Sequence, residues 1–441
     1  MIPVSQAEQI ILDLVQPLSE TESIDLTLAT GRILATGIVS KLDFPHWDNS
    51  AMDGYAVKFA DVRSSTSKHP ITLEVVEEIP AGYQPQREIQ SGEAARIFTG
   101  AIVPTGADTI VMQEHTQRVQ KNFVKIQVTP TARSFVRQRG AYARIGDPLL
   151  AAGTVLNPPE IAILAATGCG EVRVYRRPRV AILSTGDELV TPHQTLQPGQ
   201  LVDSNQYALA AFVTQAGGTP ICMGIVPDDR AKLTAAMSEA IASADFVLST
   251  GGVSVGDYDY VEEILAELGG DIQIRSVAIK PGKPLTVAKF DRGARVVYFG
   301  LPGNPVSALV GCWRFVRGAM AKLAGLPESR WQLNAIEAIT TQDLTADGSR
   351  ETYLWGKLAL IDGRYHFSLA DGSHSSANLI NLAGTNALAI VPVDVTSIAA
   401  GTTVRVSILS RFRVLGSLPM KNPQRVGIPE NSRQRLCAIE R

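Results

Sequence analysis

The sequence predicts a multidomain protein in which a central three-layer α/β domain, built on a mainly parallel sheet, is joined to domains rich in β-strands. Three observations predict this class. The 441 residues are too many for one ordinary hydrophobic core. Residues 178–325 alternate strand-like and helix-like runs, as βαβ units do. Residues 45–146 and 328–413 instead contain short strand-like segments between turn-forming residues.

The first elements are a helix and a set of short strands. Residues 4–16 place their apolar side chains on one helical face, and Ser5 and Glu8 have the spacing of a capping box. Within 45–146, strands are predicted at "ITLEVVEEI", "TIVMQEH" and "FVKIQVT".

The α/β region follows, and its strand-like runs are "RVAILST", "TPICMGIV", "ADFVLST", "DIQIRSVAI" and "RVVYFGL". Helices are predicted over 203–216, 229–243, 258–269 and 305–324. The stretch "LTVAKFDRGARVVYF" predicts a hairpin that turns at "DRG". Residues 414–441 are polar and lack periodicity, so we expect a disordered tail.

The composition excludes several classes of protein. Hydrophobic residues make up 45% and charged residues 19% of the chain, which is a soluble globular profile. A net charge of −2 gives no electrostatic footprint for nucleic acid. No run reaches membrane-spanning length, no secretory signal is visible, and no C-x-x-C pair is present. We therefore expect a cytoplasmic protein with reduced thiols that binds neither nucleic acid nor membranes.

The tetrapeptide "LSTG" occurs twice, at 183–186 and 248–251, each time at the end of an apolar strand. Ligands bind outside the carboxyl ends of parallel strands, and glycines there let the backbone approach an anion. "GGVSVG" is not a Walker loop, because no G-K-[ST] follows it. A tight strand-to-helix turn without any ligand is the alternative interpretation.

Carboxylates follow three of the predicted strands. Asp187 and Glu188 follow the first "LSTG", Asp257 and Asp259 follow the second, and "GIVPDDR" contains Asp228 beside Asp229. Such a rim of acids favours a hard cation such as Mg²⁺, held together with a phosphate-bearing ligand. Helix capping is the alternative and fits Asp228 or Asp229.

Positive charge is predicted at the same edge. "AIKPGKPL" places Lys280 and Lys283 around a Pro-Gly turn, and "GLPGNPVSAL" is a second stiff loop. Two lysines on such a loop can neutralise an oxyanion, although exposed lysines are often only solvated. All six histidines lie outside 194–365, and no nucleophile motif is present, so electrostatic positioning of an anion is favoured over histidine chemistry.

Two loops of the β-rich region complete the motifs, "DNSAMDGYAV" at 48–57 and "IFTGAIVPTGADTIVMQE" at 97–114. Together with "ILSTGDELV", "STGGVSVGDYDY", "KPGKPL" and "LPGNPVSAL", they resemble the molybdopterin molybdenumtransferase family of the bacterial MoeA type, which is similar to the E domain of gephyrin. The motifs occur in the family's order over about 48–310, and the resemblance covers about residues 1–413.

The resemblance implies that the chain inserts molybdate into adenylylated molybdopterin, with Mg²⁺, hydrolysis of the pyrophosphate link and release of AMP. It implies an elongated homodimer with a β-rich lid domain, a C-terminal β-barrel-like domain and an active cleft between two subunits. Molybdopterin adenylyltransferase and molybdoenzyme-delivery proteins are the implied partners. The implied domains are 1–24 with 178–327 (α/β), 25–44 with 147–177 (linking), 45–146 (β-rich) and 328–413 (C-terminal).

The resemblance also assigns residues. The implied catalytic residues are Asp53, Thr99, Glu188, Asp228 and Asp259, of which Glu188, Asp228 and Asp259 would hold the metal. The predicted substrate-binding residues come from the two Gly-rich strand ends and from the family motifs together. They are Ser184, Thr185, Gly186, Asp187, Gly251, Gly252, Ser254, Gly256, Lys280, Lys283, Pro302, Pro305, Arg350 and Ser375, the last taken from the serines of "GSHSSANLI".

One stretch departs from the family pattern. In "VRQRGAYARIGDPLLAAGTVL", Ala141 and Tyr142 stand where the family has Glu and a functional Asp. Tyrosine donates a hydrogen bond but carries no charge at neutral pH. The departure leaves open a binding, storage or delivery protein for the cofactor that does not turn it over.

Overall fold

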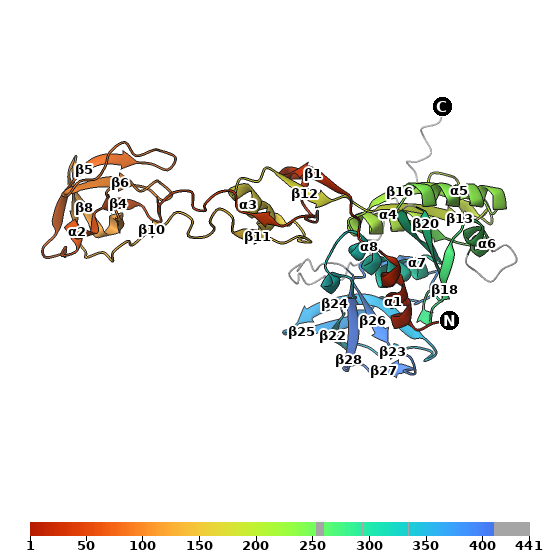
Figure 1. Ribbon diagram of the computed structural model, residues 1–441. Coiled ribbons are helices and arrows are strands. Elements are labelled where there is room, and N and C mark those ends of the chain that lie inside the picture. Colours follow the sequence, from red (N-terminus) through yellow and green to blue (C-terminus); the bar gives the residue numbers. More distant parts are fainter. Residues whose placement is uncertain (253–259, 293, 334, 410–441) are drawn as a thin grey trace, which may run out of the picture.

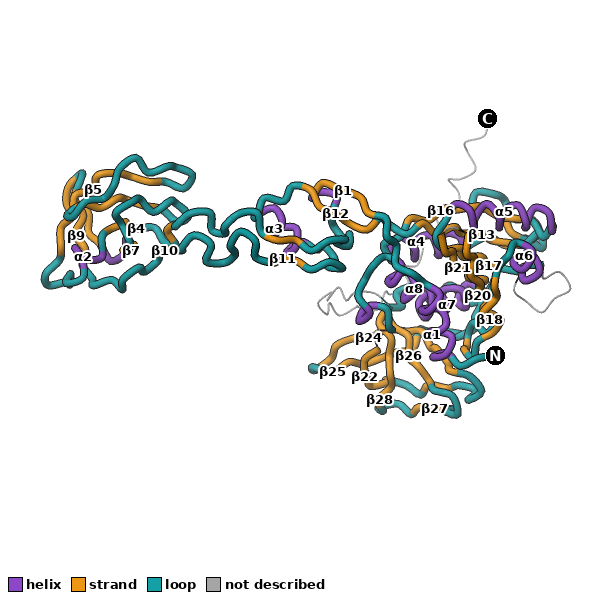
Figure 2. The backbone as a smooth tube through the Cα atoms, in the orientation of Figure 1, coloured by secondary structure: helices purple, strands orange, loops and turns teal. Residues whose placement is uncertain are grey.

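The computed structural model describes residues 1–252, 260–292, 294–333 and 335–409. The molecule is elongated, with a body on one side and an arm that extends away from it (Figure 1). The helices gather mainly in the body, whereas strands and loops make up most of the arm (Figure 2). Among the described residues, no helix combines the length and apolar character that a membrane span requires. The predicted tail at 414–441 lies outside the described residues.

The body is built on the predicted α/β sheet, whose strand order is β16-β13-β17-β21-β20-β18. Its strands are β13 (Arg179–Thr185), β16 (Thr219–Val226), β17 (Phe246–Thr250), β18 (Asp271–Ser276), β20 (Pro284–Arg292) and β21 (Ala294–Leu301). The first four strands in that order are parallel, whereas β20 is antiparallel to both of its neighbours. The mainly parallel sheet and the hairpin of β20 and β21 are therefore confirmed.

Helices cover both faces of this sheet, which makes three layers. One face packs against α1 (Val4–Leu14), α4 (Asn205–Gln215), α7 (Pro305–Gly311) and α8 (Arg317–Leu323), and the other against α5 (Arg230–Ser243) and α6 (Val261–Glu267). Alternate residues of β13 supply the two cores, since Val180 and Ile182 face the first group while Ala181 and Leu183 face the second.

The C-terminal strands close into a barrel. The strands are β22 (Ala335–Thr340), β24 (Glu351–Ile361), β25 (Arg364–Leu369), β26 (Ala387–Val391) and β28 (Thr403–Ile408). The order β24-β25-β22-β28-β26 returns to β24, so no edge remains open in this ring. The two-residue strand β19 (Ile279–Lys280), which follows the α/β strand β18, pairs with β24 and joins the barrel to the α/β unit.

The arm has two parts (Figure 1). Near the body, β1 (Thr21–Asp25) pairs with β12 (Glu171–Tyr175), and β2 (Ile38–Val39) pairs with β11 (Pro148–Leu150), beside α3 (Pro158–Ala166). The far part is a six-stranded sheet in the order β7-β4-β6-β5-β9-β8. Its strands are β4 (Gly54–Val57), β5 (Ile71–Ile79), β6 (Glu93–Ile97), β7 (Thr109–Met112), β8 (Thr116–Gln120) and β9 (Phe123–Ile126), with α2 (Phe59–Val62) and the short pair β3 (Asn49–Ser50) and β10 (Val136–Arg137) beside them.

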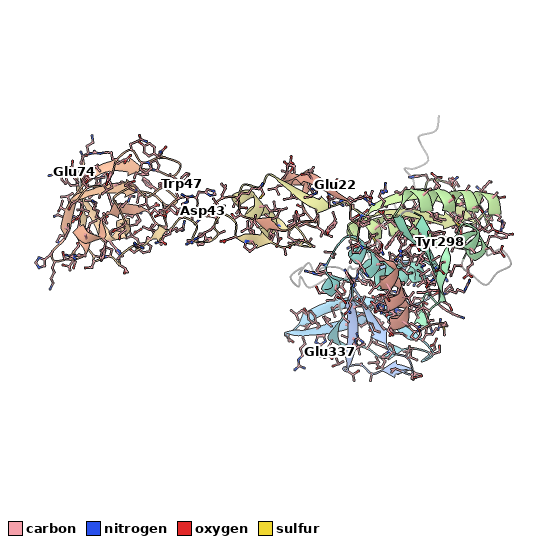
Figure 3. All side chains as sticks on the ribbon, viewed as in Figure 1. Glu22, Asp43, Trp47, Glu74, Tyr298 and Glu337 are labelled. Carbon is pink, nitrogen blue, oxygen red and sulfur yellow. The ribbon has the colours of Figure 1, made fainter. Side chains whose placement is uncertain are left out.

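A thin neck connects the two parts of the arm, and Figure 3 labels Asp43 and Trp47 there. Asp43 accepts hydrogen bonds from Arg139 Nε at 2.6 Å and from the Ile145 N–H at 3.0 Å. These bonds lower the pKa of Asp43, with the Ile145 N–H as the larger cause. The carboxylate thereby ties the outgoing chain to the returning chain across the neck.

Two local predictions need correction. The capping box of Ser5 and Glu8 is wrong, because α1 begins after Pro3 and has no side-chain cap. Glu8 instead accepts bonds of 2.6 and 2.8 Å from the guanidinium of Arg314. The single helix predicted over 305–324 is interrupted between α7 and α8 by a π-helical turn, Cys312–Val316, which contains Arg314.

Candidate functional site

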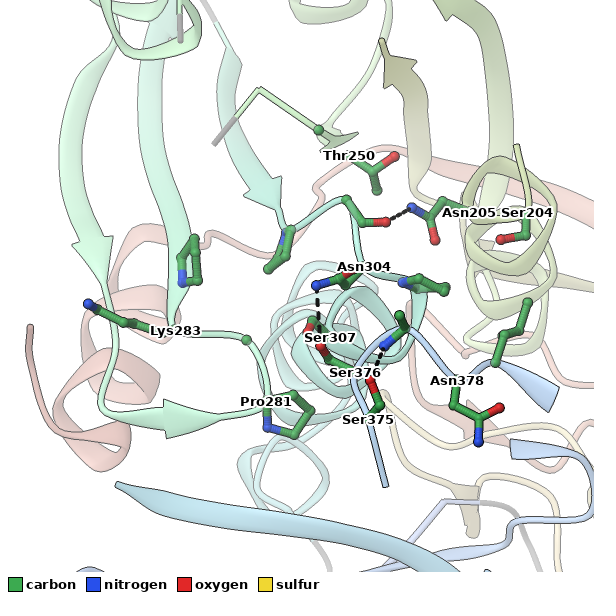
Figure 4. A pocket seen from close by; sticks show the side chains of 18 of the residues that line it. Ser204, Asn205, Thr250, Pro281, Lys283, Asn304, Ser307, Ser375, Ser376 and Asn378 are labelled. Carbon is green, nitrogen blue, oxygen red and sulfur yellow. Dashed lines mark hydrogen bonds between the residues drawn. The ribbon is translucent and has the colours of Figure 1, made fainter. Parts of the chain in front are cut away.

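A pocket of about 1130 Å³ lies where the carboxyl edge of the α/β sheet meets the barrel. Its α/β walls are the loops after β13, β17, β18 and β21, and its barrel walls are β24 and residues 374–380. Figure 4 shows the side chains of both walls pointing toward a common space. The predicted residues that line it are Thr185, Glu188, Gly251, Gly252, Lys280, Lys283, Pro302, Pro305, Arg350 and Ser375.

The two "LSTG" copies end neighbouring parallel strands, β13 and β17. Gly251 has φ +92°, and a Cβ there would lie 2.5 Å from the carbonyl oxygen of Thr185. Glycine is therefore required for the two loops to approach each other. Ser184 is fully buried beneath them and accepts a 3.3 Å bond from the Thr250 hydroxyl, so it supports the loops without lining the pocket.

The acids after β13 and β16 lie close together. Asp187 accepts a 3.1 Å hydrogen bond from the backbone N–H of Asp228. Desolvation raises the pKa of Asp228, and the negative charges of Asp187 and Glu188 raise it further. Only Glu188 of these three lines the pocket, and Gly186 lies directly against its carboxylate. The three acids form a crowded negative cluster at one side of the pocket.

The loop after β17 contains predicted residues that lie outside the described part of the chain. They are the predicted metal ligand Asp259, the neighbouring Asp257 and the predicted substrate-binding residues Ser254 and Gly256. In the part of the chain that is described, no group of three or more His, Cys, Asp or Glu side chains is arranged to hold a metal ion. Asp229 caps α5 by accepting a 2.9 Å bond from the Lys232 N–H, so the capping interpretation is correct for this residue.

The cations come from both domains. Lys280 belongs to β19, Lys283 to the following turn, and Arg350 to the segment that precedes β24. Asp347 contacts two of them, accepting from Lys280 Nζ at 2.9 Å and lying 3.4 Å from Arg350 Nη2. The Ser349 hydroxyl and the Lys280 ammonium lower the pKa of Asp347, in that order, so this carboxylate stays charged. Sequence reasoning missed Asp347, because its partner Lys280 is 67 residues away.

The "LPGNP" loop fastens the barrel to the α/β unit. Asn304 Nδ2 donates to Ser376 Oγ at 3.2 Å (Figure 4), and the Val306 N–H donates to the Ser376 carbonyl at 3.2 Å. On the other side of the loop, Asn205 Nδ2 donates to the Gly303 carbonyl at 2.8 Å. Ser375 is exposed beside these contacts, and its Oγ accepts a 3.4 Å bond from the Ala377 N–H.

The sequence disfavoured histidine at the site, yet His374 lines the pocket. Its ring lies 4.5 Å from the ring of Trp355, and its Nε2 is 2.9 Å from the Ala370 carbonyl. Sequence reasoning missed it because the motif-rich stretch belongs to the α/β unit, whereas His374 comes from the barrel.

The arm holds the remaining predicted residues. Asp53 accepts bonds from the Thr99 N–H at 2.8 Å and the Thr99 hydroxyl at 2.7 Å, and these bonds lower its pKa. Asp53 directly precedes β4, which Figure 1 shows in the far part of the arm, away from the pocket of the same chain. Tyr142 lies in the neck, 65% exposed, with its ring 5.9 Å from that of Phe44.

Family models match three consecutive parts of the chain. They describe the MoeA N-terminal region (domain I and II) at residues 2–168, a probable molybdopterin binding domain at 181–322, and the MoeA C-terminal region (domain IV) at 337–409. The chain belongs to the MoeA family. A molybdopterin molybdenumtransferase of Nostoc sp. is 57% identical, over 92% of this chain and 93% of that protein.

Other members of the MoeA family extend this likeness. A molybdopterin molybdenumtransferase of Bacillus subtilis is 33% identical, over 92% of this chain and 94% of that protein. A solved structure of the molybdopterin biosynthesis MoeA protein from Pyrococcus horikoshii OT3 has a TM-score of 0.77 and 28% identity, and it covers 92% of this chain and all of that chain. The elongated multidomain fold predicted from the motifs is the fold of this family.

Proposed function

We propose that this chain acts in molybdenum cofactor biosynthesis as a molybdopterin molybdenumtransferase. It would insert molybdate into adenylylated molybdopterin, hydrolyse the pyrophosphate link and release AMP. Membership of the MoeA family and the relatives' names support this activity. The observation that carries it is one pocket that is lined by the Gly-rich strand ends, by Glu188 and by three cations. The storage alternative is not favoured, because relatives along the full chain are named as transferases.

The cations are the proposed oxyanion site. Lys280, Lys283 and Arg350 line one side of the pocket, and Ser375 adds a hydroxyl beside them. A tetrahedral oxyanion needs several donors that do not have to reorganise. Asp347 holds Lys280, and Arg350 is held by Asp347 and by the Ile279 carbonyl. Thr185, Gly251 and Gly252 form the neighbouring wall, where the backbone of the two half-buried glycines would accommodate a pyrophosphate.

The acids are the proposed Mg²⁺ site. Glu188, Asp228 and Asp259 would hold the ion, which supplies Lewis-acid stabilisation of phosphate charge when bound. Carboxylate oxygens are the ligands that Mg²⁺ prefers, and Asp187 lies beside Asp228, so the negative charge gathered there supports a cation at this position. Glu188, which lines the pocket, would orient the ligand. The Asp187 carboxylate would hold the loop of Asp228 by accepting a bond from the Asp228 N–H.

The arm residues imply a second chain. We infer a homodimer in which Asp53 and Thr99 of one chain complete the pocket of the other, because within one chain the arm carries them away from it (Figure 1). The enzyme would work in the cytoplasm, receiving its substrate from molybdopterin adenylyltransferase and passing its product to proteins that load molybdoenzymes.

The test is an AMP-release assay. Purified protein is incubated with adenylylated molybdopterin, with and without Mg²⁺ and molybdate, and both AMP and the molybdenum-containing product are measured. We expect both products only in the complete mixture. Lys283→Ala should reduce product formation at least about tenfold, whereas the control Lys289→Ala, on β20 and outside the pocket, should not. Absence of AMP in the complete mixture would refute the proposal.

A further inference from the structure

Asp203 lines the pocket and has one carboxylate oxygen without a hydrogen-bond partner among the described residues. It lies just before α4, lines the pocket and is only 2% exposed. Its Oδ1 accepts a 3.1 Å bond from the Gln206 N–H, whereas its Oδ2 has no hydrogen-bond partner among the described residues. Burying a carboxylate oxygen without a donor costs free energy. An oxygen left in this state at a ligand pocket indicates that a donor on the ligand completes it.

The surroundings of Asp203 limit what that ligand group is. Leu201 and Val202, the two preceding residues, also line the pocket and are 60% and 39% exposed. Leu189 lines the pocket beside them. Exposed apolar side chains next to a buried acceptor fit a flat heterocycle, whose face covers the apolar surface while an amino group at its edge donates a hydrogen bond. A phosphate or an oxyanion has no such donor and would be repelled by the carboxylate.

The pocket therefore has two chemically different sides. In Figure 4, Ser204 and Asn205, which follow Asp203 in the chain, lie on the other side of the Asn304 loop from Lys283. The lysine side carries positive charge for an oxyanion, and the Asp203 side offers an acceptor and apolar surface. A ligand with a charged centre and an amino-bearing ring would use both sides at once.

We propose that Asp203 is a specificity-determining residue whose Oδ2 accepts a hydrogen bond from the amino group of a substrate heterocycle. The inference rests on the proposed function, since adenylylated molybdopterin contains two such rings, adenine and the pterin. Both rings offer the same chemistry, an exocyclic amino N–H beside a ring nitrogen, so the experiment must distinguish between them.

The test compares ligand pairs that differ in the amino group. Asp203→Asn keeps an oxygen for the Gln206 N–H but replaces Oδ2 by a donor. Binding is measured for AMP against purine riboside 5′-monophosphate, which lacks the amino group, and for pterin-6-carboxylate against lumazine-6-carboxylate, which has an oxo group instead. We expect the native protein to prefer the amino member of one pair about tenfold or more. Asp203→Asn should abolish that preference, and the affected pair identifies the ring.

The matched control is Asp229→Asn. Like Asp203, Asp229 accepts a bond from the backbone N–H three residues later, here that of Lys232 at 2.9 Å, but Asp229 does not line the pocket. The Asp229→Asn variant should keep the native preference for the ligand that carries the amino group. If Asp203→Asn fails to fold by circular dichroism, Asp203→Ser, whose hydroxyl can still cap the helix, takes its place.

Two outcomes overturn the inference. One is a native protein without preference in either pair, and the other is a preference that persists in Asp203→Asn. The AMP-release assay of the native protein separates these outcomes from failure of the proposed function. Native protein that releases AMP but shows no amino preference refutes the role of Asp203 alone, whereas native protein that releases no AMP refutes the proposed function.

Discussion

The body and the arm of this chain hold their predicted functional residues in different ways. In the body, residues of two domains meet in one pocket and are fixed by bonds between domains, such as Asn304 to Ser376 and Lys280 to Asp347. In the arm, Asp53 is held by Thr99 within one small sheet. The body therefore makes its pocket by packing domains together, whereas the arm holds a preformed pair away from the pocket of its own chain (Figure 1).

The largest expected effect is on AMP release, when the arm substitution and the body substitution are placed on different chains of one dimer. We expect Asp53→Ala and Lys283→Ala to be nearly inactive alone, because each removes one half of the proposed composite site. Mixing the two variants after dissociation should restore about a quarter of the native AMP release, since half the dimers carry one intact site. Release that stays at the level of the single variants would show that the arm does not act on a second chain.

The junction between arm and body should give the largest effect on stability. Arg176, just after β12, donates bonds of 2.7 and 2.8 Å to the buried Asp245 of the body, and Asp245 also accepts from the Arg179 N–H at 2.7 Å. Asp245→Ala leaves buried donors unpaired and should destabilise the body by about 3–5 kcal/mol. Thermal unfolding measures this, and Asp271→Ala, at an exposed pair with Lys289, should lower the melting temperature far less. An equal fall in melting temperature in both variants would contradict a special stabilising role for the Arg176–Asp245 contact.

A smaller effect, on the affinity for molybdate, is expected from changing the charge of the pocket. Asp347→Asn removes the carboxylate that neutralises Lys280 and Arg350. We expect molybdate to bind about 3- to 10-fold more tightly, with a steeper dependence on salt. Isothermal titration calorimetry at two ionic strengths measures this. The control is Asp343→Asn, because Asp343 accepts a bond from the Ala400 N–H and does not line the pocket. Weaker binding by Asp347→Asn would mean that Asp347 mainly positions the cations.

The smallest effect concerns pH. The raised pKa of Asp228 means that it gains its proton at a higher pH than an ordinary aspartate, so Mg²⁺ affinity should fall on acidification before that of an unperturbed site. Asp187→Asn removes a negative neighbour and should move this acid limb to lower pH by about one unit or less. Mg²⁺ titrations across pH measure the shift. An unchanged limb would show that Asp228 does not set the pH dependence.

The sequence predicted the strands and helices of the body more accurately than the contacts between them. The carboxyl ends of parallel strands necessarily share an edge, so Thr185, Glu188 and Gly251 could be brought together from pattern alone. No local pattern could place Lys280 in a barrel strand, because β19 pairs with β24 about 70 residues later. A long separation in sequence also explains why the capping box at Glu8 was predicted wrongly. The partner of Glu8 is Arg314, which is 306 residues away in the chain.

The two lysines of the pocket belong to different structural units although only two residues separate them. Lys280 pairs through β19 with Thr352 of the barrel, whereas the carbonyl of Lys283 accepts a 3.0 Å bond from the Val277 N–H beside the α/β sheet. A rotation of the barrel against the sheet would change the separation of the two ammonium groups. The spacing of these charges thus depends on the angle between the domains, and a pair of spectroscopic labels on β24 and β20 would follow that angle as an oxyanion binds.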